Sequence, residues 1–318
     1  MKIIDIINKA KDPFISFEII PPARGRSARE IYEIIDELME FKPPFIDVTS
    51  HAADSYYVEQ ENGTFTRHIK RKRPGTIGLC AAIKYRYKVE AVPHLLCQGF
   101  NKQETEDALI ELNYLGIENV LAIRGDHLQY KKDQAAGKEV NEYSLDLVKQ
   151  IANMNRGKYL EDILDADESD FCTGVGGYPE KHPDSPSMAA DIRYLKEKVD
   201  AGAQYIVSQM FFSNDDFYKF VECCRDEGIK VPIIPGLKLL TRKTQLNSLP
   251  HSFAVNIPDD FVKTFEAAEN ARERQEIGMA HAIRQCEDLL NNGISNIHFY
   301  VMQDTRLVKR VIKSLKLI

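Results

Sequence analysis

The chain has 318 residues, of which 43% are hydrophobic and 28% charged, as in ordinary globular proteins of aqueous compartments. Its net charge of −6 argues against nucleic acid and anionic membranes as main partners, because both repel an acidic protein. No apolar run approaches the length of a membrane span, and MKIIDIINKAKDP is too interrupted by charge for a signal peptide. We therefore expect a cytoplasmic protein that does not enter membranes.

The cysteines show neither a CxxC pair nor a Cys/His arrangement at zinc spacing. We expect reduced core thiols in a reducing compartment and no metal site. The six positions are Cys80, Cys97, Cys172, Cys223, Cys224 and Cys286.

The first predicted strand, 14–20 in PFISFEIIPP, contains a carboxylate among β-formers. A buried ionised carboxylate without partners is costly, so Glu18 indicates either an edge strand or an acid with a function.

Strand-like and helix-like runs alternate along the chain. The predicted strands are 14–20, 45–50, 88–94, 118–124, 171–178, 204–212, 231–237 and 296–302. The predicted helices include 27–40, 103–115, 143–153, 187–201, 214–227 and 270–291. Glycine follows several of the helices and precedes a strand, as in LGIEN, DAGAQ, DEGIK and NNGIS, which is typical of helix-to-strand connections in a parallel sheet. Eight such strands favour an α/β fold of the (β/α)8 TIM-barrel type, and no GxGxxG supports an open nucleotide-binding sheet.

Three stretches depart from the minimal pattern. Residues 127–170 follow the fourth strand and predict a long surface insertion, which includes the helix at 143–153. The region 241–291 has room for extra helices, and the basic run RHIKRKRP at 67–74 is predicted to be a solvated helix start or loop. Because no linker or repeat divides the chain, residues 1–318 are expected to form a single barrel domain.

Polar residues stand at the ends of six successive strands. In a parallel barrel, chemistry takes place at the carboxyl ends of the strands. A lone histidine there is more often structural, and an aspartate after glycine can simply cap a turn. The repetition nevertheless predicts a functional site, and its members are Glu18, Thr49, His94, Asp126, Tyr178 with His182, and Gln209.

The helix after the fifth strand carries Asp191 and Lys198, seven residues and two turns apart. Spacing alone favours an exposed pair of charges on one helix face.

Nine short motifs, in order over about nine tenths of the chain, resemble the methylenetetrahydrofolate reductase family. They are SFEIIPP, VTSHA, EAVPHLLC, AIRGD, GYPEKHP, LKEKVDAGA, SQMFF, IIPGL and IHFY. The resemblance implies a (β/α)8 barrel that holds FAD, which is reduced by NADH or NADPH and then reduces 5,10-methylenetetrahydrofolate to 5-methyltetrahydrofolate. The length is that of the bacterial catalytic subunit.

The resemblance makes Glu18 the general acid that protonates N10 of the folate. An unperturbed glutamate has a pKa of about 4.3 and is a poor donor near neutral pH. We expect burial in an apolar strand to raise the pKa of Glu18.

The resemblance also assigns the remaining site residues. It places Asp126 between flavin and folate as a catalytic residue, and gives Gln209 contacts with both folate and nicotinamide. Gln245, in less distinctive surroundings, is a further folate contact, and Leu249 is either an apolar contact of the ligand or an ordinary core leucine. For FAD the resemblance implies Thr49, His94, Arg124, Gly125, Asp126, Tyr178, His182, Asp191 and Lys198. On this reading Asp191 meets a hydroxyl of the nucleotide and Lys198 a phosphate.

Two positions depart from the family pattern. Ser50-His51 replaces an aromatic-glycine pair after the second strand. After HFY the family reads Thr-Leu-Asn-Arg, whereas this chain has Gln303 for the asparagine and Asp304 for the substrate-binding arginine. Arg306 would then have to reach back to the folate tail.

Three alternatives stay open from the sequence. Another flavin barrel, of the proline-dehydrogenase kind, would not need Glu18, Asp126 and Gln209 together. A non-catalytic folate- or flavin-binding barrel would be consistent with Asp304. A true reductase could also take electrons from a partner protein instead of NADH. By resemblance we expect direct use of NADH and a homo-oligomer.

Overall fold

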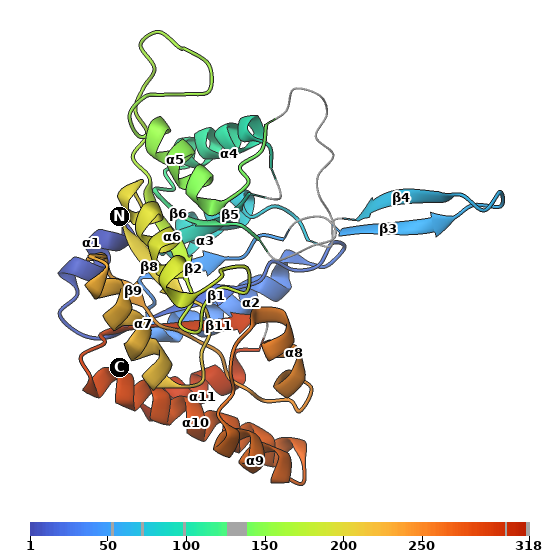
Figure 1. The fold of residues 1–318 in the computed structure, drawn as a ribbon, viewed down its shortest axis with the longest axis vertical. Helices are drawn as coiled ribbons and strands as arrows, with labels where there is room; N and C mark the ends of the chain where they lie inside the picture. The colour runs from blue at the N-terminus through green and yellow to red at the C-terminus, as the bar shows by residue number, and fades with distance from the viewer. Residues whose placement is uncertain (52–53, 71–72, 98–99, 126–138, 303, 316–318) are drawn as a thin grey trace.

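Parallel strands form a ring at the centre of the molecule (Figure 1). The computed structural model describes residues 1–318 except 52–53, 71–72, 98–99, 126–138, 303 and 316–318. The sheet order is β10-β11-β1-β2-β5-β6-β7-β8-β9. Its strands are β1 (Phe14–Ile19), β2 (Phe45–Val48), β5 (Glu90–Leu96), β6 (Asn119–Ile123), β7 (Cys172–Gly177), β8 (Tyr205–Ser208), β9 (Ile233–Ile234), β10 (Gly236–Leu237) and β11 (Asn296–Met302).

The ring closes at Pro235, which separates β9 from β10. β9 pairs with β8 and β10 pairs with β11, so these two short strands act as one strand of the barrel. Proline lacks an N–H to continue a ladder, but its carbonyl accepts a hydrogen bond from the His298 N–H at 2.9 Å. The eight predicted strands are therefore all present, and the predicted (β/α)8 barrel is confirmed.

Helices surround the ring and pack their apolar faces on it. Several begin at side-chain caps, including the Asn101–Glu104 capping box that starts α4. The barrel helices are α2 (Ala28–Leu38, followed by the 3-10 turn η1, Met39–Phe41), α3 (Ile77–Tyr87), α4 (Lys102–Tyr114), α5 (Ser144–Met154), α6 (Met188–Asp200), α7 (Asn214–Asp226), α10 (Ala271–Asn291) and α11 (Arg306–Ser314). The region predicted to have room for extra helices also contains α8 (Gln245–Phe253) and α9 (Asp259–Ala267).

A β-hairpin projects from the barrel after β2 (Figure 1). Strands β3 (Asp54–Glu59) and β4 (Phe65–Lys70) pair antiparallel with each other. The prediction of a helix start or loop at 67–74 was therefore wrong for residues 67–70. Alternating bulky residues in FTRHIK pair with DSYYVE across a turn at ENG, and this pairing outweighs the high positive charge.

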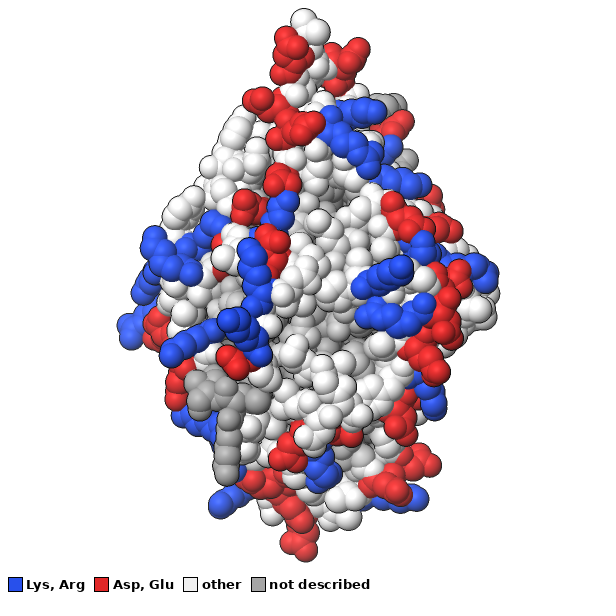
Figure 2. Space-filling model, turned by 90° about the vertical axis from the view of Figure 1, so that its left-hand side faces the viewer, with Lys and Arg blue, Asp and Glu red and all other residues white. Residues whose placement is uncertain are grey.

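The N-terminal helix α1 (Ile3–Lys9) covers the end of the barrel at which the strands begin. Ile3 is fully buried against Phe45 and Val92, and its N–H donates to Asn119 Oδ1 at 2.8 Å. Seen from the side on which α1 lies, acidic and basic side chains are interspersed around an uncharged central area (Figure 2). None of the helices in the described part of the chain is long and apolar enough to cross a membrane.

All six cysteines are free thiols. Cys223 is exposed and the others are buried, so the expectation of core thiols holds for the others and is wrong for Cys223.

Candidate active site

A cavity of about 330 Å³ opens at the carboxyl ends of the strands. The strands of the barrel point alternate side chains inward, so residues far apart in sequence meet there. The cavity brings together most of the residues predicted at strand ends: Glu18, Thr49, His94, Arg124, Gly125, Tyr178, His182 and Gln209. Ser50 and His51, which depart from the family pattern, also line it.

Glu18 points into this cavity from β1. Its neighbours Phe17 and Ile19 are fully buried on the opposite face of the strand, under the helices. The Glu18 side chain is 12% exposed. The pairing of β1 with β11 slips here, with Glu18 opposite Tyr300 and Ile19 opposite Met302. Such bulges re-aim side chains and are common beside functional sites.

His94 lies between Glu18 and a second carboxylate, Asp47 on β2. Its Nε2 is 3.6 Å from Glu18 Oε2 and 3.4 Å from Asp47 Oδ2. Burial alone would lower the pKa of His94, but its hydrogen bond to Asp47 and the charges of Glu18 and Asp47 outweigh it and raise that pKa. The surroundings of His94 therefore favour its protonated, positively charged form.

Tyr300, on the strand next to Glu18, and Gln209, after β8, also line the cavity. The Tyr300 hydroxyl donates to the Ser208 carbonyl at 2.6 Å, and this contact fixes the ring beside Gly236. Gln209 Oε1 accepts from the Met210 N–H at 2.9 Å. The Gln209 amide NH2 makes no hydrogen bond to another described residue and is available to a ligand.

Arg124 is held at the end of β6 by an ion pair. Its guanidinium donates to Asp184 Oδ2 at 2.6 Å and lies over the Tyr143 ring, 5.1 Å from the centroid. Two buried polar atoms of the cavity residues, Arg124 Nε and Thr49 Oγ1, have no hydrogen-bond partner among the described residues. Buried polar atoms are normally paired, so these two indicate contacts with a ligand.

Asp191 and Lys198 of α6 are half-buried, so the exposed pair that spacing alone favoured is wrong. Neither lines the cavity. Asp191 accepts from the His182 N–H at 2.9 Å and from Ser185 Oγ at 2.7 Å, so it fixes the loop that carries His182. Burial lowers the pKa of Lys198, although Asp191 opposes the shift.

A second cavity, of about 680 Å³, adjoins the first and shares Lys238, Leu249 and Tyr300 with it. Gln245 lines only this second cavity, and its Oε1 accepts from the backbone N–H of Thr241 and Arg242. Lys238 brings positive charge to the shared wall, and Arg242 brings positive charge to the second cavity alone. Burial lowers the pKa of Lys238, the charge of Glu18 raises it, and Arg242 lowers it further.

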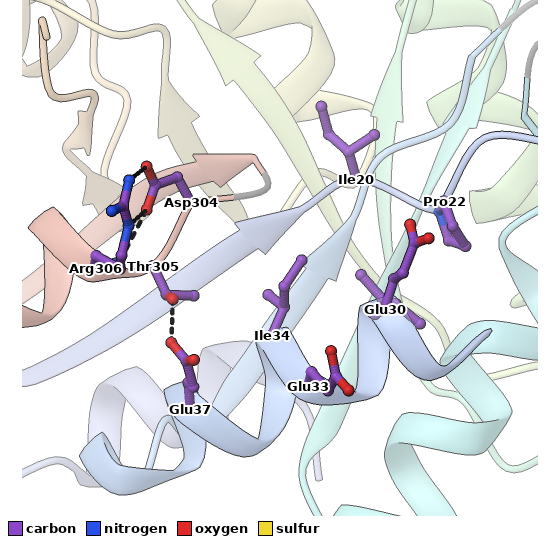
Figure 3. A pocket seen from close by; sticks show the side chains of 10 residues that line it. Ile20, Pro22, Glu30, Glu33, Ile34, Glu37, Asp304, Thr305 and Arg306 are labelled. Carbon is purple, nitrogen blue, oxygen red and sulfur yellow. Dashed lines mark hydrogen bonds and ion pairs between the residues drawn. The ribbon is translucent and has the colours of Figure 1, made fainter. Parts of the chain in front are cut away.

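Arg306 lies farther out, between the second cavity and a third one of about 510 Å³ (Figure 3). Its guanidinium forms a two-pronged ion pair with Asp304, at 3.0 Å and 3.2 Å. Figure 3 shows the two side chains turned toward each other, with Glu37 bonded to Thr305. Arg306 is thus held by the residue that replaces the family arginine, and the structure does not bring it to Glu18.

Asp126 and Gln303, both predicted site residues, lie outside the described residues. Sequence reasoning missed Asp47 and Lys238. Asp47 could have been found by strict alternation in FIDV, where it shares the inward face with Phe45 and Thr49. Lys238 stands at the end of the seventh strand, where a polar residue continues the pattern of the other strand ends.

The chain is similar to known proteins over almost its whole length. The family model described as methylenetetrahydrofolate reductase matches residues 2–316. "Methylenetetrahydrofolate reductase (NADH) 1" of Arabidopsis thaliana is 31% identical over 333 residues, covering 100% of this chain and 51% of that protein. "5,10-methylenetetrahydrofolate reductase" of Pectobacterium carotovorum is 28% identical over 294 residues, covering 92% of this chain and 87% of that protein.

A solved structure supports the fold independently. It is an uncharacterised protein from Clostridium thermocellum that binds two copies of 5-methyl-5,6,7,8-tetrahydrofolic acid, with a TM-score of 0.57 and 14% identity, covering 98% of this chain and 96% of that one. The chain spans about half the length of several eukaryotic relatives, 46% for the Schizosaccharomyces pombe protein. Because the family model matches residues 2–316 and the fold is a barrel, the chain belongs to the methylenetetrahydrofolate reductase family.

Proposed function

We propose that this chain reduces 5,10-methylenetetrahydrofolate to 5-methyltetrahydrofolate, with FAD as cofactor and NADH or NADPH as donor. Family membership supports the substrate. The observation that carries the proposal is Glu18, a carboxyl group in the wall of the central cavity with His94 and Gln209 in the same cavity.

Glu18 is proposed as the general acid. Opening of the five-membered ring of the substrate needs a proton at N10, and it leaves a cationic carbon–nitrogen double bond at N5 that accepts hydride. A carboxylic acid within hydrogen-bond reach can deliver that proton. The enclosure of Glu18 keeps competing water away from it. Gln209, with its unused amide NH2, is proposed to orient the folate ring.

Two features of the cavity support a flavin as its ligand. Thr49 Oγ1 and Arg124 Nε are buried polar atoms without a hydrogen-bond partner among the described residues, and a side chain at Gly176 would meet no described atom within 4 Å. We propose that FAD is held by Thr49, His94, Arg124, Gly125, Asp126, Tyr178, His182, Asp191 and Lys198. When bound, FAD supplies the hydride for the substrate carbon. Asp191 contributes by fixing the His182 loop, and Lys198 by positive charge.

The second cavity is proposed to take the folate tail. Its carboxylates need cations, and Lys238 and Arg242 line this cavity. Arg306 forms an ion pair with Asp304, so we assign it only a contact with the outer end of the folate tail. Gln245, Gln303 and Leu249 remain proposed folate contacts.

The choice of donor and the assembly state stay predictions. The names of relatives include NADH for Arabidopsis thaliana and NADPH for Caenorhabditis elegans. Direct use of a nicotinamide donor and self-association are what we propose, on the basis of resemblance.

The test follows the visible spectrum of the purified protein without oxygen. NADH should bleach a yellow protein, and methylenetetrahydrofolate should restore the colour. Glu18→Gln should keep the bleaching and slow the recolouring by at least about 100-fold, which is the usual contribution of a general acid. Glu222→Gln, an exposed change on α7, is the matched control.

Three other outcomes would each contradict a part of the proposed function. A yellow protein that NADH and NADPH both leave oxidised would favour a partner protein as donor. A colourless protein that takes up no added FAD would favour a non-catalytic barrel. Recolouring at the normal rate by the Glu18→Gln variant would remove Glu18 from the mechanism.

A further inference from the structure

A group of buried polar side chains lies inside the barrel next to Glu18, and Asp47 is directly paired with Glu18 across β1 and β2. Asp47, Ser16 and His298 are all completely buried. Asp47 lies on β2 and His94 lies on β5. In the ring, β2 stands between β1 and β5 (Figure 1). The proposed chemistry makes no use of Asp47, yet a carboxylate is expensive to bury and requires an explanation.

Asp47 has one charged partner in this group, His94. Its Oδ2 is 3.4 Å from His94 Nε2, whereas its Oδ1 has no hydrogen-bond partner in the described part of the chain. His298, the other histidine here, stays neutral because burial lowers its pKa to about 4, and its Nδ1 contacts Ser16 Oγ at 2.8 Å. Positive charge in this group therefore resides on His94.

The same nitrogen, His94 Nε2, also faces Glu18 Oε2 at 3.6 Å. The three groups form one titrating cluster, since each lies within the range at which charges shift a neighbour's proton affinity. Asp47 is the nearer carboxylate and the more enclosed, with 1% of its side chain exposed against 12% for Glu18. Asp47 is thus the natural counter-ion of a protonated His94.

We infer that Asp47 is a positioning residue that holds His94 charged and, through its own negative charge, keeps Glu18 protonated between turnovers. Without Asp47 the cluster loses one negative charge, and both remaining groups bind their protons less tightly. Glu18 would then be next to positive charge from His94 and Lys238 without the compensating charge of Asp47, which favours its carboxylate form. The inference rests on the proposed function in one respect, the role of Glu18 as acid.

Other titratable and charged side chains line the same cavity as Glu18: His51, Arg124, Tyr178, His182, Lys238 and Tyr300. Burial and the charges of Glu18 and Asp47 raise the pKa of Tyr300, so its hydroxyl stays neutral. Lys238 acts on Glu18 from the seventh strand in the same sense as His94, which makes a compensating negative charge more necessary.

The first test measures the wild-type protein. The imidazole of His94 is titrated by NMR with selectively labelled histidine, and its signal is assigned by comparison with His94→Gln. We expect His94 to remain protonated above the ordinary midpoint of 6.5. A neutral His94 at pH 6 would overturn the inference.

The second test compares Asp47→Asn with Ser16→Ala, a change in the same buried group that does not touch His94. Asp47→Asn should lower the His94 midpoint and move the alkaline limb of the folate half-reaction to lower pH by about one unit or more. Bleaching by NADH should be unaffected. Ser16→Ala should leave both midpoints in place.

The two readouts separate this inference from the proposed function. If the wild type shows no folate half-reaction, the proposed function fails, and the His94 titration still tests Asp47. If Asp47→Asn titrates like Ser16→Ala in both measurements, Asp47 has only a packing role and the inference is wrong.

Discussion

Glu180, in the loop after β7, carries a carboxyl group enclosed by a distant part of the chain. Its Oε2 accepts from the Asn256 N–H at 2.5 Å, in the segment between α8 and α9. Its Oε1 is buried without a hydrogen-bond partner among the described residues. Burial raises the pKa of Glu180 to about 7, the Asn256 N–H opposes the shift and Asp216 adds to it. The loop that carries Tyr178 and His182 therefore has a contact that depends on pH.

The sign of that dependence follows from linkage. The folded protein binds this proton more tightly than the unfolded chain, whose glutamate has a pKa of 4.5. The stabilisation by Glu180 is thus fully present below pH 4.5 and is lost as pH rises through about 7. Glu180→Gln should match the wild type in urea unfolding at pH 4.5 and exceed its free energy of unfolding at pH 8. Equal gains at both pH values would contradict the pKa of Glu180.

At the scale of elements, the hairpin β3–β4 stands apart from the barrel. In the described residues its strands pair only with each other. Tyr57 and Phe65 are each 64% exposed, so little apolar surface is buried there. The hairpin therefore contributes little to the stability of the barrel.

A shortened hairpin tests this conclusion. Asp54 and Lys70 are directly paired, so residues 55–69 can be replaced by Asn-Gly without moving the ends. We expect the midpoint of thermal unfolding to change by less than about 2 °C, because no packed element is removed. A fall of 5 °C or more by calorimetry would show that the hairpin packs on the barrel.

Some elements can be predicted from the local sequence pattern, whereas others depend on contacts with distant parts of the chain. α11 was not predicted, although Leu307, Val308, Val311 and Ile312 repeat at helical spacing and are all buried. α3 gives a weaker signal, since IGLCAAIKYRY mixes apolar residues around much of the helix. The 67–70 strand was mispredicted because its partner lies on the other arm of a hairpin, and pairing is not a local property.

At the scale of the whole molecule, stability depends on closure of the ring of strands and on helix α1, which covers one end of that ring. Helix α1 buries Ile3 completely among residues that begin four different strands or follow them closely, including Phe45 and Cys172. Loss of this contact would open the end of the barrel opposite the site.

Substitution at Ile3 measures how much the packing of helix α1 contributes to the free energy of unfolding. Ile3→Ala should lower the free energy of unfolding by about 2–5 kcal/mol, since the cavity left at a closed barrel end cannot collapse. Ile4→Ala, at a neighbouring half-buried position, is the control and should cost less. Chemical denaturation followed by circular dichroism gives both values. Similar costs would mean that α1 lies loosely on the barrel.

The alternation of strands and helices, with a glycine after many helices, was enough to predict all eight barrel strands, because backbone periodicity is local. Reading the strand ends was enough to predict Glu18, Thr49, His94, Tyr178, His182 and Gln209. The family resemblance added Arg124 and Gly125, and the structure gathers all of these residues in one cavity. Only the tertiary structure revealed the contact of His94 with Asp47, the burial of Lys238 and the engagement of Arg306 by Asp304. These depend on distances between side chains from different strands, which are set when the ring closes and which no stretch of sequence contains.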